Sequence, residues 1–308
     1  MIISASRRTD IPAFFSDWFM NRIKEGFVLV RNPFNHQQVS RISLNSDVVD
    51  CIVFWTKNPA NLVNKLSVLD RMNYHYYFQF TLTPYGRDVE PNLPDKQDMI
   101  STFINLSKMI GRDRMAWRYD PVVLTGRLDQ KYHYREFEAM VQKLAPYTER
   151  CIISFLDFYE KTKRNMAGLN VVRSDMPEMR EIAGNFMKIA RSHGLRLETC
   201  AEEVDLTDIG IENGKCIDDK LISKILGRDM FFKKAQGQRK TCGCISSIDI
   251  GAYNSCPHNC LYCYANYSND LVKANIALHD PNSPFLIGRP QDDDKVIQKK
   301  MESCIQVQ

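Results

Sequence analysis

Short apolar runs typical of β-strands alternate with longer amphipathic stretches over the first two-thirds of the chain. The predicted strands cover residues 2–6, 51–56, 76–83, 114–120, 151–158 and 195–200. Apolar residues at a helical period predict helices over residues 12–25, 59–72, 96–110, 134–144 and 177–192. Residues 27–44 interrupt this order and have the pattern of an early β-hairpin insertion. Repeated strand and helix units indicate an α/β fold built on a parallel sheet with right-handed crossovers.

Polar side chains follow nearly every predicted strand at the end where the strand stops. They include Ser6, Arg7, Arg8, Thr9, Asp10, Thr56, Lys57, Asn58, Thr81, Thr83, Arg118, Asp120, Asp157, Cys200 and Glu202. Catalytic groups of (β/α) barrels come from the carboxyl ends of several strands, whereas open doubly wound sheets often carry a glycine-rich loop after the first strand. No G-x-G-x-x-G is present. We therefore expect a (β/α) TIM-like barrel, complete or partial, with an open sheet as the alternative.

A chain of 308 residues with 44% hydrophobic residues is sufficient for one large domain. We expect residues 1–240 to form the barrel body, residues 241–268 a cysteine segment that completes the same domain, and residues 269–308 a C-terminal extension. The N-terminus lacks the apolar core of a signal peptide, and no apolar run approaches the roughly 20 residues that a membrane span needs. A cytoplasmic protein with no membrane contact is therefore expected.

Cysteines are concentrated late in the chain, where five of the ten lie between Cys242 and Cys263. The core of this region is Cys256-x3-Cys260-x2-Cys263. Such short intervals bring three thiolates around one small volume, which suits a metal or an iron–sulfur cluster better than a disulfide. With three thiolates, a [4Fe–4S] cluster keeps one iron open to a substrate or cofactor.

Other uses of these cysteines remain open at this point. Cys242, Cys244 or His258 could complete a closed zinc site with the three cysteines. Cys244, or Cys242, could instead supply a fourth cluster ligand, and the two could also form a redox pair. Cys200 ends a predicted strand near Glu202, whereas the polar surroundings of Cys216 predict no role.

The segment CPHNCLYCY resembles the C-x3-C-x2-C motif of radical S-adenosylmethionine enzymes, including the aromatic residue, here Tyr262, before the third cysteine. The resemblance implies a [4Fe–4S] cluster on Cys256, Cys260 and Cys263 whose open iron binds S-adenosylmethionine. Reductive cleavage of that cofactor to a 5′-deoxyadenosyl radical and a full or partial barrel are also implied. Two features differ from the family. Its motif normally follows the first strand, and its glycine-glycine-acid segment has no counterpart, since the chain contains no Gly-Gly pair.

Three segments along the chain resemble a bacterial family known as domain of unknown function 1848. They are SASRRTDIPAF near the start, FWTKNP beyond it, and DIGAYNSCPHNCLYCYAN late in the sequence. The resemblance covers most of residues 1–268. It implies a C-terminal cysteine cluster similar to that of radical S-adenosylmethionine enzymes, without an established activity.

Charged residues at the predicted strand ends are the candidates for contacts with substrate or cofactor. Arginine forks bind carboxylate or phosphate groups, so Arg7 and Arg8 with Asp10 could hold an anion or only tie the rim together. Arg118 and Asp120 lie two residues apart and should face the same side of their strand, where they could bind a ligand or neutralise each other. The predicted catalytic residues are Arg7, Asp10, Lys57, Arg118, Asp120 and Glu202, the predicted cofactor-binding residues are Arg8 and Tyr262, and the predicted metal ligands are Cys256, Cys260, Cys263 and Cys244.

These features together predict an iron–sulfur enzyme with an open-site cluster above a polar barrel rim. It would cleave S-adenosylmethionine with an electron from a donor such as a flavodoxin or ferredoxin and act on an unknown substrate, which could be anionic. One alternative is an iron–sulfur enzyme that does not use S-adenosylmethionine. Another is a non-catalytic iron–sulfur or zinc protein that binds nucleic acid or a protein partner, although a net charge of +4 is only weak support for nucleic acid.

Overall fold

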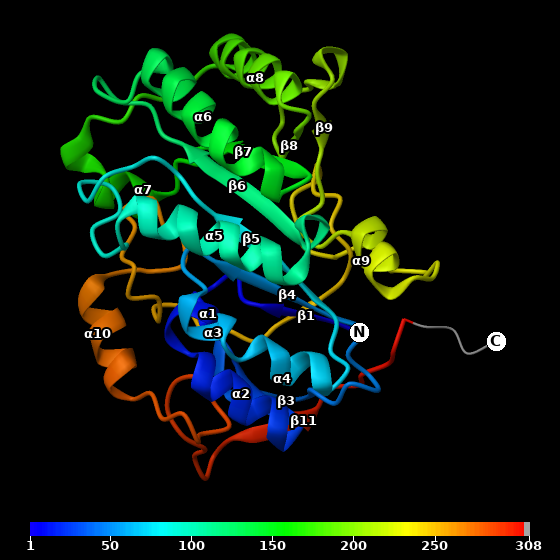
Figure 1. The fold of residues 1–308 in the computed structure, drawn as a ribbon. Coiled ribbons are helices and arrows are strands. Elements are labelled where there is room, and N and C mark those ends of the chain that lie inside the picture. Colours follow the sequence, from blue (N-terminus) through cyan, green and yellow to red (C-terminus); the bar gives the residue numbers. More distant parts are fainter. Residues whose placement is uncertain (305–308) are drawn as a thin grey trace.

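One parallel sheet of eight strands organises the chain in the computed structural model, which describes residues 1–304 (Figure 1). The strand order is β10-β1-β4-β5-β6-β7-β8-β9, and every neighbouring pair is parallel. The strands are β1 (Ile2–Ala5), β4 (Cys51–Thr56), β5 (Tyr76–Thr81), β6 (Met115–Val122), β7 (Arg150–Phe155), β8 (Arg196–Thr199), β9 (Glu212–Asn213) and β10 (Ile248–Asp249). The predicted α/β class, its parallel sheet and its six strands are therefore confirmed, while β9 and β10 were not predicted.

The helices connect successive strands, as the predicted crossovers require. They are α1 (Ile11–Phe14), α2 (Ser16–Glu25), α3 (Ala60–Val63), α4 (Leu66–Arg71), α5 (Lys96–Ile110), α6 (Gln130–Leu144), α7 (Glu160–Asn165), α8 (Met176–Ser192), α9 (Asp219–Leu226) and α10 (Asn269–Ala277). Short 3₁₀ turns cover η1 (Arg112–Arg114), η2 (Ala145–Tyr147), η3 (Ala167–Leu169) and η4 (Thr207–Ile209). In the described part of the chain, no helix combines the length and apolar character needed to cross a bilayer.

Two of the predicted helices are interrupted. The stretch 12–25 contains α1 and α2, because the Asp10 side chain caps α1 and Phe15 leaves helical geometry with a φ of −128°. The stretch 59–72 likewise contains α3 and α4. Gly26 ends α2 with a φ of +74°, as expected of a glycine after the last helical turn.

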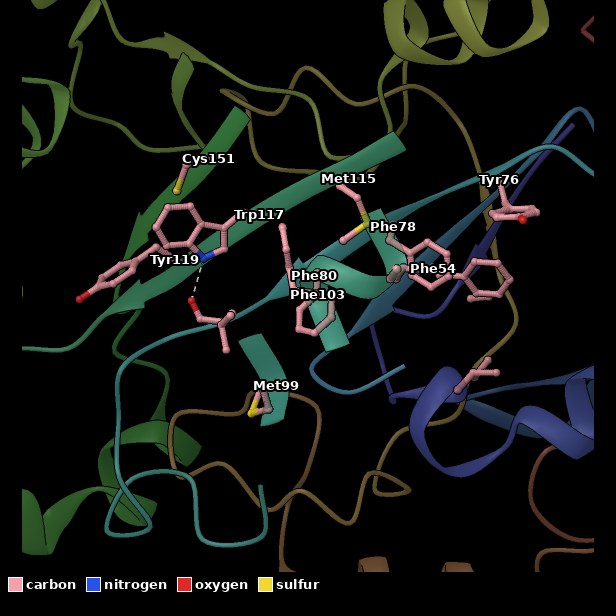
Figure 2. Close-up of a cluster of buried hydrophobic side chains, with 14 of the residues drawn as sticks. Phe54, Tyr76, Phe78, Phe80, Met99, Phe103, Met115, Trp117, Tyr119 and Cys151 are labelled. Atoms are coloured by element: carbon pink, nitrogen blue, oxygen red, sulfur yellow. Dashed lines mark hydrogen bonds between the residues drawn. The ribbon is translucent and has the colours of Figure 1, made fainter. Parts of the chain in front are cut away.

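The two faces of the sheet differ in chemistry because strand side chains alternate between them. One face carries large apolar side chains, including Phe54, Phe78 and Trp117, which are fully buried in the main core (Figure 2). The Trp117 ring stacks on Phe137 of α6 at a centroid distance of 5.4 Å, and its Nε1 donates to the Leu82 carbonyl at 2.9 Å. Helices α5 and α6 lie over this face in Figure 1.

The opposite face is apolar near the amino ends of the strands and polar farther along them. Ile2, Val53 and Tyr77 pack in a second core with Leu221 and Ile222 of α9. Farther along the strands this face carries polar side chains, among them Gln79, Arg118, Asp120 and Ser154. Arg118, Asp120 and Ser154 of this region form the floor of the pocket described below.

The predicted early hairpin is present as β2 (Phe27–Asn32) and β3 (Asn35–Ser43), which pair antiparallel. A third strand, β11 (Lys295–Gln298), pairs in parallel with β3. The C-terminal segment also packs on α2, since Trp18 Nε1 donates to the Ser283 carbonyl and Arg22 Nη2 to the Asn282 carbonyl, both at 3.0 Å. The described part of the extension is thus attached to the body.

We predict that Trp117→Ala lowers the free energy of unfolding by about 3–5 kcal/mol, because it removes a fully buried stacked ring and leaves a cavity. Urea unfolding followed by circular dichroism measures the change. Phe34→Ala is the matched control, since Phe34 is 95% exposed and its loss should change the free energy by less than about 0.5 kcal/mol. Equal effects of the two substitutions would contradict this account of the core.

Candidate cysteine-lined active site

The cysteine segment is attached to the edge of the sheet by β10, which pairs with β1 through Ile3–Ile248 and Ser4–Asp249. The Asp249 carboxylate accepts hydrogen bonds from Ser4 Oγ at 2.9 Å, from Ser6 Oγ at 2.5 Å and from the Arg7 backbone N–H at 2.8 Å. It therefore connects the end of β10 to the loop that follows β1.

Gly251 lies where a side chain could not be accommodated. A Cβ atom at this position would be 2.1 Å from Ser6 Oγ and 2.6 Å from Ser6 Cβ. The backbone after β10 consequently passes directly over the end of β1, and the three motif cysteines follow within twelve residues of Gly251.

A pocket of about 520 Å³ lies at the carboxyl ends of the strands. Its lining includes residues at or just beyond the ends of six strands, namely Ser6 after β1, Thr56 of β4, Thr81 of β5, Asp120 of β6, Ser154 of β7 and Cys200 after β8. Of the ten cysteines, seven line this pocket: Cys200, Cys216, Cys242, Cys244, Cys256, Cys260 and Cys263. The predicted metal ligands and most of the polar residues predicted at the strand ends therefore face the same pocket.

The three motif thiols are free; Cys260 is buried, and Cys256 and Cys263 are half-buried. Burial raises the pKa of Cys256, of Cys263 and of Cys260, the last to about 12. Binding of a metal centre would displace these protons, since thiolates are the ligands. Among residues 1–304, no three or more His, Cys, Asp or Glu side chains lie as a ligand group around a single ion. An iron–sulfur cluster does not require the thiolates to surround a single ion, because each thiolate binds a different iron atom. Three thiols on one short loop and facing one pocket provide a donor set suited to such a cluster.

Asp10 connects the cysteine loop to two neighbouring strands. One carboxylate oxygen accepts from the Ala13 N–H at 3.0 Å, and the other accepts from the Lys57 N–H at 2.7 Å and lies 2.9 Å from His258 Nε2. His258 is buried between Cys256 and Cys260, and its Nδ1 has no hydrogen-bond partner among the described residues. The predicted catalytic Asp10 is thus engaged in positioning the loop.

A buried carboxylate, Glu90, holds two lysines and the motif tyrosine. It accepts from Lys57 Nζ at 2.7 Å and from Thr83 Oγ1 at 2.7 Å, and it also contacts Lys96 Nζ and the Tyr262 hydroxyl. Burial alone would raise the pKa of Glu90, but the two ammonium groups outweigh this effect and lower it to about 2. The same carboxylate raises the pKa of Lys57 despite desolvation. Tyr262 and Lys57, both predicted site residues, are therefore fixed beside Cys260.

Arg118 and Asp120 pair with each other at the floor of the pocket. Arg118 Nε donates to Asp120 Oδ2 at 3.0 Å, and a second guanidinium nitrogen contacts the same oxygen. Burial would raise the pKa of Asp120, but the Arg118 charge lowers it. Arg118 Nη1 also donates to Cys216 Sγ at 2.9 Å. The two residues face the same side, as predicted, and their charges neutralise each other.

Arg7 and Arg8 also line the pocket, but their side chains form few hydrogen bonds and ion pairs among the described residues. Arg7 Nη2 reaches Ser247 Oγ at 3.4 Å, and its guanidinium lies 5.7 Å from the centre of the Trp55 ring. Within residues 1–304, Arg7 forms no ion pair, whereas Arg8 Nε is 4.0 Å from Asp249. Arg7 is the better placed of the two to attract an anionic group.

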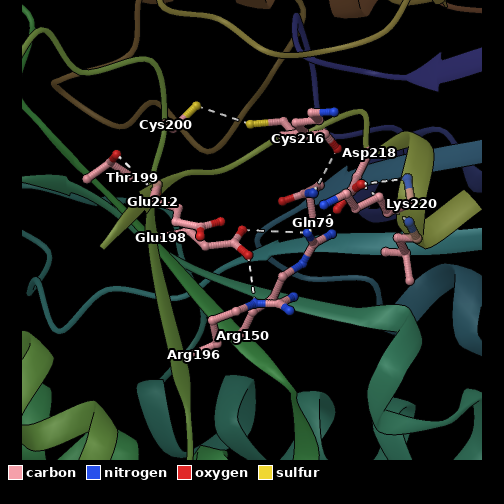
Figure 3. Close-up of polar contacts among 12 residues, drawn as sticks. Gln79, Arg150, Arg196, Glu198, Thr199, Cys200, Glu212, Cys216, Asp218 and Lys220 are labelled. Carbon is pink, nitrogen blue, oxygen red and sulfur yellow. Dashed lines mark hydrogen bonds and ion pairs between the residues drawn. The ribbon is translucent and has the colours of Figure 1, made fainter. Parts of the chain in front are cut away.

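Two predicted site residues lie away from the three-cysteine loop. Glu202 accepts from the Phe155 N–H at 2.9 Å, and burial raises its pKa to about 7, but it does not line the pocket. Cys244 lines the pocket but lies with Cys216 and Cys242 in the second core. The neighbouring Cys244 thiol lowers the pKa of Cys242 to about 6. Cys200 lies 3.1 Å from Cys216, sulfur to sulfur (Figure 3).

Several site residues were missed in the sequence analysis. Glu90 comes from the segment between β5 and α5, and Lys96 is the first residue of α5, so no strand end marks either residue. Asp249 belongs to a strand of two residues, too short for a periodic signal. Arg239 lines the pocket and contacts Asp157 and Tyr159 Oη. The sequence feature closest to these residues is Asp249-Ile250-Gly251, which lies shortly before the cysteine motif.

We predict that Glu90→Gln lowers the free energy of unfolding by about 3–5 kcal/mol at neutral pH, because the partly buried ammonium groups of Lys57 and Lys96 lose their buried counter-charge. The pKa of about 2 lies below the ordinary 4.5, so the carboxylate stabilises the fold above pH 4.5 and loses this effect as the pH falls toward 2. Denaturant unfolding between pH 5 and pH 2 should show a shallower pH dependence in the variant. Glu138→Gln, on the exposed face of α6, is the control, and identical slopes for Glu90→Gln and wild type would refute the assignment.

Comparison with known proteins identifies a family. No curated protein matches the chain. A solved structure described as a "putative alpha-L-fucosidase from Bacteroides thetaiotaomicron" is 13% identical, with 73% of this chain and 83% of that chain covered and a TM-score of 0.26. A family model described as "Domain of unknown function (DUF1848)" matches residues 2–265. The predicted family is thereby confirmed, and the chain belongs to the DUF1848 family.

Proposed function

We propose that this protein is an iron–sulfur enzyme that holds a [4Fe–4S] cluster on Cys256, Cys260 and Cys263 and reductively cleaves S-adenosylmethionine to act on another substrate. The observation that carries the proposal is that the three thiols face the same pocket as the polar carboxyl ends of six strands. Three thiolates leave one iron of such a cluster without a protein ligand, and the pocket gives a small molecule access to that position.

The position of the motif in the sheet also supports the proposal. In radical S-adenosylmethionine enzymes, the motif normally follows the first strand, whereas here it comes late in the sequence. In space, however, it follows β10, which is the edge strand next to β1. The loop after a parallel edge strand therefore carries the cysteines here too, although the chain reaches that strand last.

When bound, the cluster would supply one electron to S-adenosylmethionine at its open iron. The residues of this chain would position the cofactor and exclude water. Arg7, without an ion-pair partner in residues 1–304, would bind an anionic group of the cofactor or substrate. Arg8 and Tyr262 would contact the cofactor, with Tyr262 held by Glu90. Lys57 would keep positive charge close to Cys260, because Glu90 maintains it as an ammonium.

The fold and cellular setting belong to the same proposal. We propose that the sheet curves as a partial (β/α) barrel, since side chains from β1 to β8 converge on one pocket. An exposed iron requires reducing conditions, and the ten unpaired cysteines suit the cytoplasm. A flavodoxin or ferredoxin would deliver the electron.

The first test is metal content after anaerobic reconstitution with iron and sulfide. We predict that changing Cys256, Cys260 and Cys263 to Ala lowers the iron and labile sulfide content by about four each per chain. Cys304→Ala is the control, because Cys304 lies away from the pocket next to Asp50. Unchanged iron in the triple variant, or zinc without labile sulfide in the wild type, would rule out the cluster.

The second test is cofactor cleavage by the reconstituted wild-type protein. With dithionite and S-adenosylmethionine, we expect 5′-deoxyadenosine and methionine, detected by liquid chromatography and mass spectrometry. Cys260→Ala should abolish formation of both products, and Cys304→Ala should not change it. An intact cluster that gives no 5′-deoxyadenosine would instead favour an iron–sulfur enzyme that does not use S-adenosylmethionine.

A further inference from the structure

Four cysteines outside the motif converge from three separate segments on the floor of the same pocket. Cys200 follows β8, Cys216 precedes α9, and Cys242 and Cys244 lie before β10. Cys200 and Cys216 are 3.1 Å apart, sulfur to sulfur (Figure 3). Cys216 and Cys244 are buried in the second core, and Cys200 and Cys242 pack against it. The four cysteines thus lie in one cluster, called here the cysteine quartet.

The backbone around the cysteine quartet is fixed by buried hydrogen bonds. Tyr77 Oη and Gln79 Nε2 donate to the Cys216 carbonyl at 2.7 and 2.9 Å. Two further contacts join the Cys216 and Cys244 segments: the Ile217 N–H donates to Cys244 Sγ at 3.5 Å, and the Ile245 N–H donates to the Ile217 carbonyl at 3.1 Å. The meeting of these segments is therefore part of the fold.

Two sulfurs of the quartet accept hydrogen bonds from nearby donors. Arg118 Nη1 donates to Cys216 Sγ at 2.9 Å from a fully buried guanidinium, and the Ile217 N–H approaches Cys244 Sγ. Cationic groups and N–H donors at sulfur stabilise thiolates, and such outer-shell contacts are typical of thiolate ligands of metals. Four thiols with these neighbours exceed what one disulfide requires and equal the number of ligands in a closed zinc or iron–sulfur site.

We propose that Cys200, Cys216, Cys242 and Cys244 form a second metal site that binds a thiophilic metal, as a zinc or iron ion or as an iron–sulfur cluster, through four thiolates. This site is separate from Cys256, Cys260 and Cys263, which lie on the loop held by Asp10. In residues 1–304 as described, the four thiols do not yet surround a single ion. The 3.1 Å between Cys200 and Cys216 is also shorter than the spacing of about 3.8 Å between thiolates that are each 2.3 Å from one tetrahedral ion. Metal binding therefore requires these side chains to rotate into a ligand arrangement.

The test uses the full chain with Cys256, Cys260 and Cys263 changed to Ala, so that its result does not depend on the proposed three-cysteine cluster. The protein is reduced anaerobically and titrated either with Co²⁺ or with Fe²⁺ and sulfide. We expect either about one Co²⁺ per chain with thiolate-to-cobalt charge-transfer absorption, or iron with equal labile sulfide. The first result assigns a single-ion site and the second a cluster.

Two further substitutions make the result specific to the quartet. In the variant that lacks the three motif cysteines, the further changes Cys200→Ala and Cys216→Ala should weaken metal binding by more than about tenfold. The further change Cys304→Ala should leave the affinity for the metal unchanged. If the multiple variants do not fold, Cys242→Ser in the otherwise wild-type chain should still lower the total metal content, because Cys242 is only partly buried and its substitution should leave the fold intact. Metal uptake that does not depend on the quartet would overturn the proposal. A Cys200–Cys216 disulfide in the anaerobically purified protein, detected by alkylation and mass spectrometry, would also overturn it.

Discussion

The pairing of the two-residue strand β10 with β1 determines where the cysteine motif lies. Asp249 accepts hydrogen bonds from both serine hydroxyls at the end of β1 and from the Arg7 N–H, and the close approach of Gly251 to Ser6 leaves no room for a side chain. Because the strands are parallel, this edge pairing places the loop after β10 at the same rim as the loops after β1 to β8. The pocket, the proposed cluster and the quartet all depend on that placement.

The charged groups around the pocket are paired with opposite charges or hydrogen-bond donors, which offset the desolvation penalty of burying them. Glu90 pairs with Lys57 and Lys96, and Asp120 pairs with Arg118. Asp10 accepts hydrogen bonds from the Lys57 backbone N–H and from His258 Nε2. Most of the residues that look catalytic in the sequence are thus engaged in holding the rim. Within residues 1–304, Arg7 is the rim cation without an ion-pair partner.

The sequence predicts the regular part of this fold well, because six strands and most helices have clear hydrophobic periods. The pairing of Arg118 with Asp120 is also foreseeable from their spacing. The rest depends on tertiary contacts: β10 is too short to show a period, Glu90 lies in a connecting segment, and Cys216 is positioned by hydrogen bonds from Tyr77 and Gln79 on distant β5. Helix breaks at Phe15 and between Val63 and Leu66 likewise leave the hydrophobic pattern almost unchanged.

The central claim is that Cys256, Cys260 and Cys263 hold an iron–sulfur cluster with one iron free of protein ligands. Anomalous diffraction at the iron edge, from crystals of the anaerobically reconstituted protein, tests it most directly. The account predicts a compact group of iron peaks bonded to these three sulfurs, with one iron directed into the pocket and bound to no cysteine. A single zinc-edge peak shared by the three sulfurs, or a cysteine on every iron, would contradict it.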